Sequence, residues 1–155
     1  MGRQRRRLEW ADTLITFNAI ANNTLQVSDL LANFVTDGGS REGLTIIRTH
    51  ITCSYAPATT GDRSTIGLLV ENVGAGAGPA LMNPLSNPYE PWLLIKTLYP
   101  TASGATVDAV STYEIDNKSK RKVQHVQETY WLTWISTAAG NNSFNAHVRA
   151  LIALP

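Results

Sequence analysis

The sequence is poor in cysteine and charge, and it has no long apolar run. Cys53 is the only cysteine among 155 residues, which excludes an intrachain disulfide framework and any metal site built from several cysteines. Charged residues make up 16% of the chain, below the usual quarter or so, which excludes a coiled coil and a charged disordered protein. Apolar runs such as residues 67–70 are short, so we expect no membrane span and no membrane partner.

Motifs that carry enzymatic chemistry are also missing. There is no His-Glu-x-x-His motif, and His50, His125 and His147 are far apart in the sequence. Cys53 falls on the apolar side of an expected strand, so we expect an inert buried thiol rather than a nucleophile paired with a histidine. The glycine-rich segment 74–79 is not followed by Gly-Lys-Ser/Thr and is a weak match to a phosphate loop. We therefore expect no enzyme, no catalytic residue, no metal and no cofactor.

Hydrophobic residues make up 43% of the chain, and their periodicity is mostly two, the period of half-buried strands. In residues 44–55, the odd positions from Ile47 to Tyr55 are largely apolar and the even positions from Arg48 to Ser54 are polar. Strands are expected at residues 13–17, 24–27, 44–55, 64–70, 106–115, 128–136 and 145–154.

Seven or eight strands at this spacing predict an all-β fold, an antiparallel β-sandwich that is best described as a jelly roll. An immunoglobulin-like sandwich is the alternative, since most such folds need no cysteine pair. Short helices are expected at Ser28–Asn33, with Ser28 as N-cap, and at Pro91–Leu98, where proline fits the first turn. We assign residues 1–11 to a basic N-terminal arm and residues 12–155 to a single sandwich domain.

Two connections stand out between the expected strands. Residues 138–143 are rich in alanine, glycine and asparagine and are expected to form a hairpin between the last two strands. Residues 72–91 form the longest interruption and are rich in glycine, proline and asparagine. A loop of that size in a compact domain is usually functional or part of an interface.

Eight of the 13 basic residues lie in two short segments, while the other five face all 12 acids. Such asymmetry indicates a polyanion or an acidic partner for the basic segments. The first segment cannot bury apolar area, and its guanidinium groups can bind phosphate with two hydrogen bonds each. These two segments are the basic arm, with Arg3, Arg5, Arg6 and Arg7, and the basic patch, with Lys118, Lys120, Arg121 and Lys122.

Alternation along the basic patch places Lys118, Lys120 and Lys122 on one face and Arg121 on the other. The patch is either a charged hairpin tip or edge that blocks aggregation, or a phosphate contact that acts with the arm. No aromatic residues are interleaved with it, so base stacking is not indicated. Any nucleic-acid binding should be directed at the backbone, sensitive to salt and independent of sequence.

Aromatic residues provide candidate contacts between subunits. Trp131 and Trp134 lie an odd number of residues apart, so one should be core and the other should face outward as a bare indole. Trp10 follows the arm directly and is placed to fasten it to its own domain or to a neighbour. Tyr89 and Trp92 are expected on an exposed knob of the long loop. The candidate contacts are Trp10, Tyr89, Trp92 and Trp131.

An arginine-rich arm followed by a small all-β domain with long loops resembles the viral single jelly-roll virion proteins. The arginines of the arm and the strand pattern from Thr13 to Leu154 carry the resemblance. The arginine-rich start, Pro91-Trp92 and the run Asp116–Lys122 are also similar to small bacteriophage structural proteins. The resemblance implies a capsid or capsid-associated protein located in the virion, which forms homo-oligomers, binds other capsid proteins and contacts viral nucleic acid.

Two other functions fit the same composition. A free, sequence-independent nucleic-acid-binding β-domain would need exposed aromatics beside the basic segments. A carbohydrate-binding β-sandwich would use Tyr89 or Trp92 as a stacking platform.

Overall fold

Nine strands and one short helix account for most of the residues that the computed structural model describes. Those residues are 7–19, 23–34, 43–57, 62–72, 83–84, 92–100, 111–124, 128–137 and 142–154. The strands are β1 (Leu8–Ala19), β2 (Gln26–Asp29), β3 (Thr45–Ala56), β4 (Ser64–Asn72), β5 (Trp92–Leu98), β6 (Ser111–Asn117), β7 (Arg121–Lys122), β8 (Glu128–Ser136) and β9 (Asn142–Ala153), and the helix is α1 (Leu30–Phe34).

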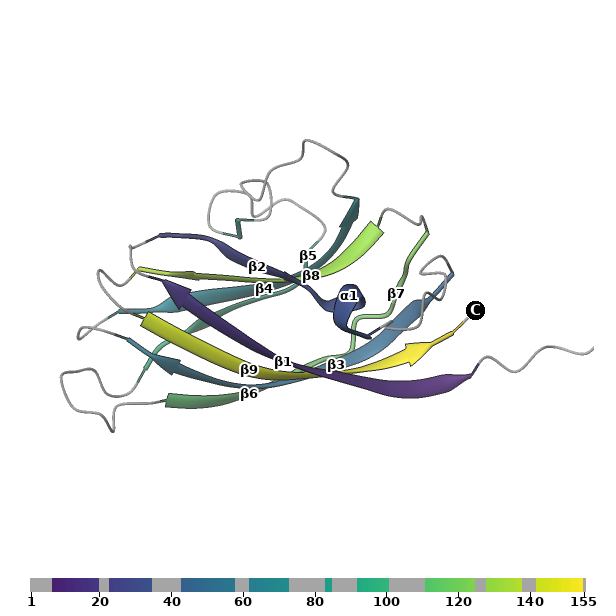
Figure 1. The fold of residues 1–155 in the computed structure, drawn as a ribbon, viewed down its shortest axis with the longest axis horizontal. Coiled ribbons are helices and arrows are strands. Elements are labelled where there is room, and N and C mark those ends of the chain that lie inside the picture. The colour runs from purple at the N-terminus through teal and green to yellow at the C-terminus, as the bar shows by residue number, and fades with distance from the viewer. Residues whose placement is uncertain are drawn as a thin grey trace, which may run out of the picture.

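Two antiparallel sheets face each other across the core (Figure 1). Sheet A has the order β1-β9-β3-β6, with β7 pairing the start of β3, and sheet B has the order β2-β8-β4-β5. Successive strands mostly alternate between the sheets: β1, β3, β6 and β9 lie in sheet A, and β2, β4, β5 and β8 lie in sheet B. This strand order is that of a jelly roll. The predicted all-β antiparallel sandwich is therefore confirmed.

The centre of the core is aromatic. Trp134 and Phe144 stack with ring centroids 5.6 Å apart, and Phe17 stacks against both at 6.0 Å. Tyr55 meets Trp134 edge to face at 6.1 Å. Because these residues come from β1, β3, β8 and β9, the cluster joins the two sheets. Trp134 is fully buried and is the core indole that alternation along β8 leads one to expect.

Two buried hydroxyl pairs tie β3 to β8 across the sandwich. The Tyr55 Oη on β3 lies 2.6 Å from the Ser136 Oγ on β8, and the Tyr130 Oη on β8 lies 2.6 Å from the Thr49 Oγ1 on β3. Burial raises the pKa of both tyrosines, so both hydroxyls stay protonated and able to donate. The pairs are reciprocal, since each strand supplies one tyrosine.

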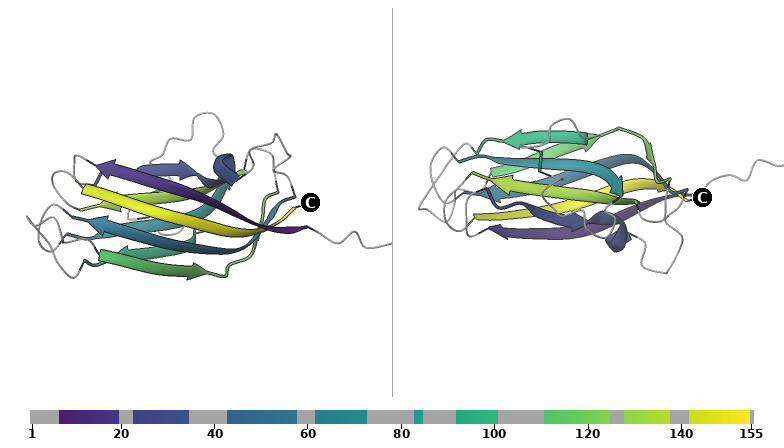
Figure 2. Two further views of the ribbon diagram at one scale, coloured as in Figure 1. Left: turned by 60° about the horizontal axis from the view of Figure 1, so that its bottom comes forward. Right: turned by 90° about the horizontal axis from the view of Figure 1, so that it is seen from above.

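Helix α1 lies beside β1, on the side of the sandwich formed by the edge strands β1 and β2 (Figures 1 and 2). Leu30 and Leu31 are fully buried, and the helix contacts β1 and β8. The predicted N-cap is wrong by one residue: the Ala32 amide donates to the Asp29 carboxylate at 2.9 Å, so Asp29 rather than Ser28 caps the helix. No helix in the described part of the chain is long and apolar enough to cross a membrane.

A boundary, an element type and a connection differ from the prediction. Strand β1 begins at Leu8, so residues 8–11, assigned to the arm, are paired with β9. Residues 92–98 form β5 instead of a helix, because the edge of β4 provides backbone partners that override the helix-start signal of Pro91. Strands β8 and β9 belong to different sheets, so the connection between them is not a hairpin.

Strand β3 carries a bulge that alternation did not predict. The register with β9 shifts between Ile46 and Arg48, so Ile47 is the extra residue. Ile46 is buried and Ile47 only half-buried, which reverses their expected positions. From Arg48 onward the predicted alternation holds, with Ile51, Cys53 and Tyr55 in the core.

Candidate interaction surfaces

Arg7, the described root of the basic arm, and the basic patch lie at the same end of sheet A. The register aligns Leu8 with Ala153, Ala153 with Thr45 and Thr45 with Lys122. The start of β1 and strand β7 are therefore three strand spacings apart, roughly 14 Å. Just beyond this row, the Leu154 amide donates to the Arg7 carbonyl at 2.9 Å, which fixes the root of the arm. The start of β1 and the end of β9 lie side by side here (Figure 1). We call this the basic end: Arg7 with Lys120, Arg121 and Lys122.

The basic patch is held in place by buried neighbours. Val123 is fully buried, and its amide donates to the Leu44 carbonyl at 2.8 Å. The Gly43 amide donates back to the Val123 carbonyl at 3.0 Å. The Ser119 amide donates to the Asn117 side chain at 3.2 Å. The cations therefore project from a fastened segment beside β3.

Part of the positive charge near this end is neutralised. Arg48 forms a bidentate ion pair with Asp116, with nitrogen–oxygen distances of 2.6 and 2.8 Å. This hydrogen bond lowers the pKa of Asp116 below its ordinary value, so the carboxylate stays charged. Lys118 lies 4.0 Å from the same carboxylate, and Arg7 lies 3.5 Å from Glu9.

The remaining cations of the patch have no ion pair within the described ranges. Lys118, Lys120 and Lys122 are exposed and Arg121 is half-buried, in keeping with the predicted alternation. Lys120, Arg121 and Lys122 are thus the cations best placed for an external anion. Arg3, Arg5, Arg6, Tyr89 and His125 lie outside the described residues.

An apolar row runs along the outer face of β1. Leu8, Trp10 and Leu14 are 58%, 48% and 83% exposed, although each is large and hydrophobic. The Arg149 guanidinium on β9 lies 5.2 Å from the centre of the Trp10 ring, and Arg149 is aligned with Asp12. Trp10 was predicted as a contact, but the two leucines were not. The signal was present, because Leu14 has the opposite parity to the core residues Ile15 and Phe17.

The other candidate tryptophans are less exposed than expected. Trp92 is the first residue of β5 and not part of an exposed knob, and its ring covers Gly67 so closely that a Cβ at Gly67 would overlap it. One face of this indole is therefore covered by its own sheet. Trp131 faces away from the core as predicted, yet it is half-buried and its Nε1 is shielded from solvent.

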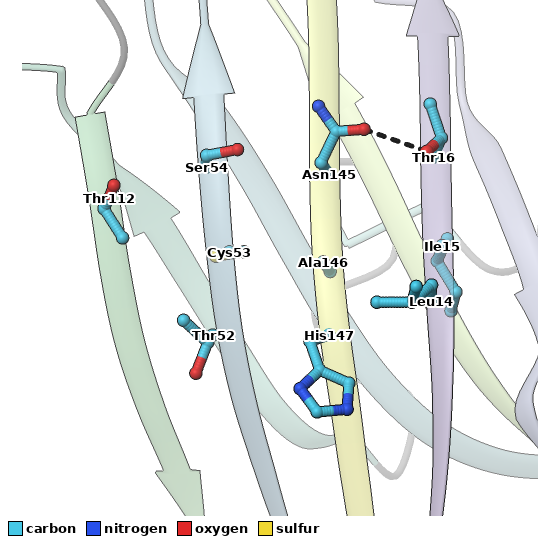
Figure 3. A pocket seen from close by; sticks show the side chains of 10 residues that line it. All are labelled: Leu14, Ile15, Thr16, Thr52, Cys53, Ser54, Thr112, Asn145, Ala146 and His147. Atoms are coloured by element: carbon cyan, nitrogen blue, oxygen red, sulfur yellow. Dashed lines mark hydrogen bonds between the residues drawn. The ribbon is translucent and has the colours of Figure 1, made fainter.

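A shallow depression of about 320 Å³ lies on the outer face of sheet A (Figure 3). Leu14 and His147 stand on one side of it, and Thr16 donates to the Asn145 side chain at 2.8 Å on the other. Small hydroxyl side chains of β3 and β6 complete the wall. The depression is lined by Leu14, Ile15, Thr16, Thr52, Cys53, Ser54, Thr112, Asn145, Ala146 and His147.

The depression lacks a pair of groups suited to catalysis. His50 and His147 lie on the outer face of sheet A, whereas the Cys53 thiol faces the core, so the sheet separates them. Burial raises the pKa of Cys53 to about 12, which keeps the thiol protonated. In the part of the chain that the structure describes, no cluster of three or more His, Cys, Asp or Glu residues is suited to hold a metal ion.

No protein-family model matches the chain, and no curated protein matches it either. Solved structures resemble its architecture. That of Desmodium yellow mottle tymovirus is 10% identical at a TM-score of 0.42, over 100% of this chain and 93% of that chain. That of tomato aspermy virus is 10% identical at 0.45, over 100% and 83%. The decameric BFDV capsid protein is 9% identical at 0.38, over 96% and 98%. At these values the likeness carries no argument about function.

Proposed function

We propose that the chain is a virion structural protein that forms a shell or binds to one, with its basic end directed at nucleic acid or at an acidic neighbour. The observation that supports this most is the position of Arg7, the root of the arm, at the same end of sheet A as strand β7. The root of the arm and strand β7 are more than a hundred residues apart in the sequence, yet both lie at one end of sheet A. A subunit of a shell needs such sidedness, because only one side of the wall meets the enclosed polyanion.

The fold alone does not decide the function, because jelly rolls form viral capsids, lectins and cupins. A cupin-type enzyme needs a metal or acid–base cluster inside the sandwich, and the described core is apolar and aromatic. A lectin of the kind expected from Trp92 would stack a sugar on an exposed indole, whereas this indole is half-buried and lies against Gly67. Concentrated cations and exposed apolar side chains on β1 favour the structural role.

The proposed contact is electrostatic. Arg3, Arg5 and Arg6 precede Arg7 in the sequence, and with the basic patch they would neutralise phosphates without reading bases. Each phosphate contact contributes about 0.7 to 0.9 to the slope of log K against log salt concentration. Deleting residues 1–6 removes three arginines, so the slope should fall by roughly 2 to 3. The deletion spares the Arg7 carbonyl, which binds the Leu154 amide.

The test is negative-stain imaging of the purified full chain, together with the ratio of absorbance at about 260 and 280 nm. We expect particles or defined oligomers, with bound nucleic acid that is reduced by the deletion and by a triple Gln variant of Lys120, Arg121 and Lys122. Arg63→Gln is the matched control, because it removes an exposed cation that directly precedes β4 in sheet B and is not part of the basic end. A strictly monomeric protein at high concentration and low salt would contradict the proposal.

The same experiment separates a coat protein from a decoration protein. A main coat protein should form particles alone and retain nucleic acid. A decoration or minor head protein, of the kind found in tailed bacteriophages, should bind only to a preformed shell.

A free nucleic-acid-binding β-domain is the second candidate. It is favoured by Trp10, which lies on an exposed sheet face under the Arg149 guanidinium, as a base-stacking platform would. This function predicts a monomer that loses nucleic-acid binding in Trp10→Ala. The shell function predicts instead that Trp10→Ala weakens assembly.

A further inference from the structure

Strand β1 is an edge of sheet A, and although helix α1 contacts it, its outer face leaves Leu8, Trp10 and Leu14 exposed. No strand pairs with its outer side in the described part of the chain, and its 12 residues contain neither proline nor lysine. Its register with β9 runs from Leu8 to Ala19 without a bulge. Natural proteins usually protect such an edge with a short strand, a lysine, a proline or a bulge, because its free amides and carbonyls can pair with another strand.

We propose that β1 pairs antiparallel with β1 of a second copy about a two-fold axis at Ala11, so that sheet A continues from one copy into the other. The inference rests on the proposed structural role and assigns one contact of the assembly. A two-fold interface uses the same surface on both copies, so it requires that β1 be complementary to itself.

The apolar row on β1 selects the position of the axis. With Ala11 on the axis, Leu8 lies opposite the partner's Leu14, and all three exposed apolar side chains of β1 fall inside the paired segment. Placing the axis at Asp12 would set two carboxylates opposite each other, which is unfavourable. Placing it at Thr13 would set Leu14 opposite a carboxylate and leave Leu8 opposite an amide.

Charge also favours a second β1 over the other edge of the sheet. With the axis at Ala11, the partner's Asp12 lies opposite Trp10, on whose ring the Arg149 guanidinium rests. Each copy thereby brings a carboxylate toward a cation of the other. The opposite edge, β6, directs Glu114 outward, so pairing it with β1 would add this acid to a face that already carries Asp12.

Cysteine cross-linking tests the axis. In Ala11→Cys the two new thiols lie directly opposite, at the Cα separation of 4.5 to 5.5 Å expected for an antiparallel pair and suited to a disulfide. We expect rapid oxidation of the full chain to a covalent dimer. In the matched variant Thr13→Cys the thiols are four residues out of register, roughly 13 Å apart, and should not cross-link. Cys53 is 2% exposed and does not compete.

A second variant tests the contact itself. Leu14→Lys places a charge on the paired face, and because Leu14 is 83% exposed the monomer should fold normally. We expect the dissociation constant of the dimer, measured by analytical ultracentrifugation, to rise at least about tenfold. Tyr99→Lys is the control, because Tyr99 is 64% exposed and lies beyond the end of β5. The dissociation constant of the dimer should not change in this variant.

The outcomes separate this contact from the proposed function. Particles without the Ala11→Cys cross-link, or a cross-link in Thr13→Cys alone, would overturn the pairing and leave the structural role standing. A cross-linked dimer that never forms or joins a particle would support the pairing and contradict the role. Equal effects of Leu14→Lys and Tyr99→Lys would also overturn the pairing.

Discussion

The buried hydroxyl pair between Tyr130 and Thr49 should behave as one energetic unit. Both residues are fully buried, and their oxygens are 2.6 Å apart. Tyr130→Phe removes a hydrogen bond worth about 1 kcal/mol and leaves the Thr49 hydroxyl without this partner, at a further cost of about 1 kcal/mol or more. In Thr49→Val the Tyr130 hydroxyl keeps the Asn117 side chain as a partner. We expect Tyr130→Phe to lose about 2 kcal/mol of unfolding free energy and Thr49→Val about 1 kcal/mol.

The double variant gives the decisive measurement. Replacing both partners by apolar groups of similar shape removes the unsatisfied hydroxyl, so the loss should be only about 1 kcal/mol, roughly 2 kcal/mol short of additive. Tyr130→Phe should lower Tm by about 4 to 8 °C and Thr49→Val by about 2 to 4 °C in a domain of this size. Urea denaturation at one fixed protein concentration measures all three, because association shifts apparent stability.

A matched control is Thr52→Val, which changes a half-buried threonine on the outer face of the same strand. It should alter the unfolding free energy by no more than about 0.5 kcal/mol. Additive losses in the Tyr130→Phe/Thr49→Val double variant would refute the reasoning, since they would show that the two hydroxyls do not depend on each other.

Three further predictions concern single sites. Arg48 lowers the pKa of Asp116, so the ion pair stabilises the fold at pH values above the pKa of Asp116 in the unfolded chain, and this contribution is lost as pH falls through the pKa of Asp116 in the folded chain. In Asp116→Asn, Tm should therefore depend less on pH on the acid side. An unchanged dependence of Tm on pH would contradict this prediction. Burial raises the pKa of Cys53 to about 12, so the thiol should react with thiol reagents only when the protein unfolds. Its contribution to stability should decline as pH rises above about 8.5, where the thiol ionises in the unfolded chain. Rapid labelling of the folded protein would count against this prediction. In Gly67→Ala the new methyl overlaps the Trp92 ring, which should cost about 1 to 3 kcal/mol in urea denaturation and change the tryptophan fluorescence, whereas a wild-type spectrum and midpoint would disprove the close contact.

The alternation of side chains predicted the strands well because it has a direct physical cause. A strand with one face in the core must alternate. Residues 128–136 were instead predicted from their aromatic and β-branched residues, with both boundaries as β8 has them, and this strand is buried along most of its length. The inner residues of β9 from Ala146 to Ile152 were also predicted, and they are buried. The burial of Cys53 followed from the same alternation in β3.

The errors arose where tertiary pairing decides the structure. Pro91 is a helix-start signal for residues 92–98, yet these residues pair with β4, and no local pattern indicates that partner. Ile47 forms a bulge that depends on how β3 meets β9. The basic end was hardest to predict, because it depends on four strands meeting in register from Leu8 to Lys122.

The hydrogen bond between the Leu154 amide and the Arg7 carbonyl has a consequence for labelling and fusion. Because residues 7 and 154 are neighbours, a peptide attached before the first or after the second departs from the same place. In any layer of copies that all point the same way, both attachments emerge into one compartment. A tag joined directly before Arg7 or after Leu154 will therefore start near the cations of β7, and an acidic tag there will compete with whatever they bind.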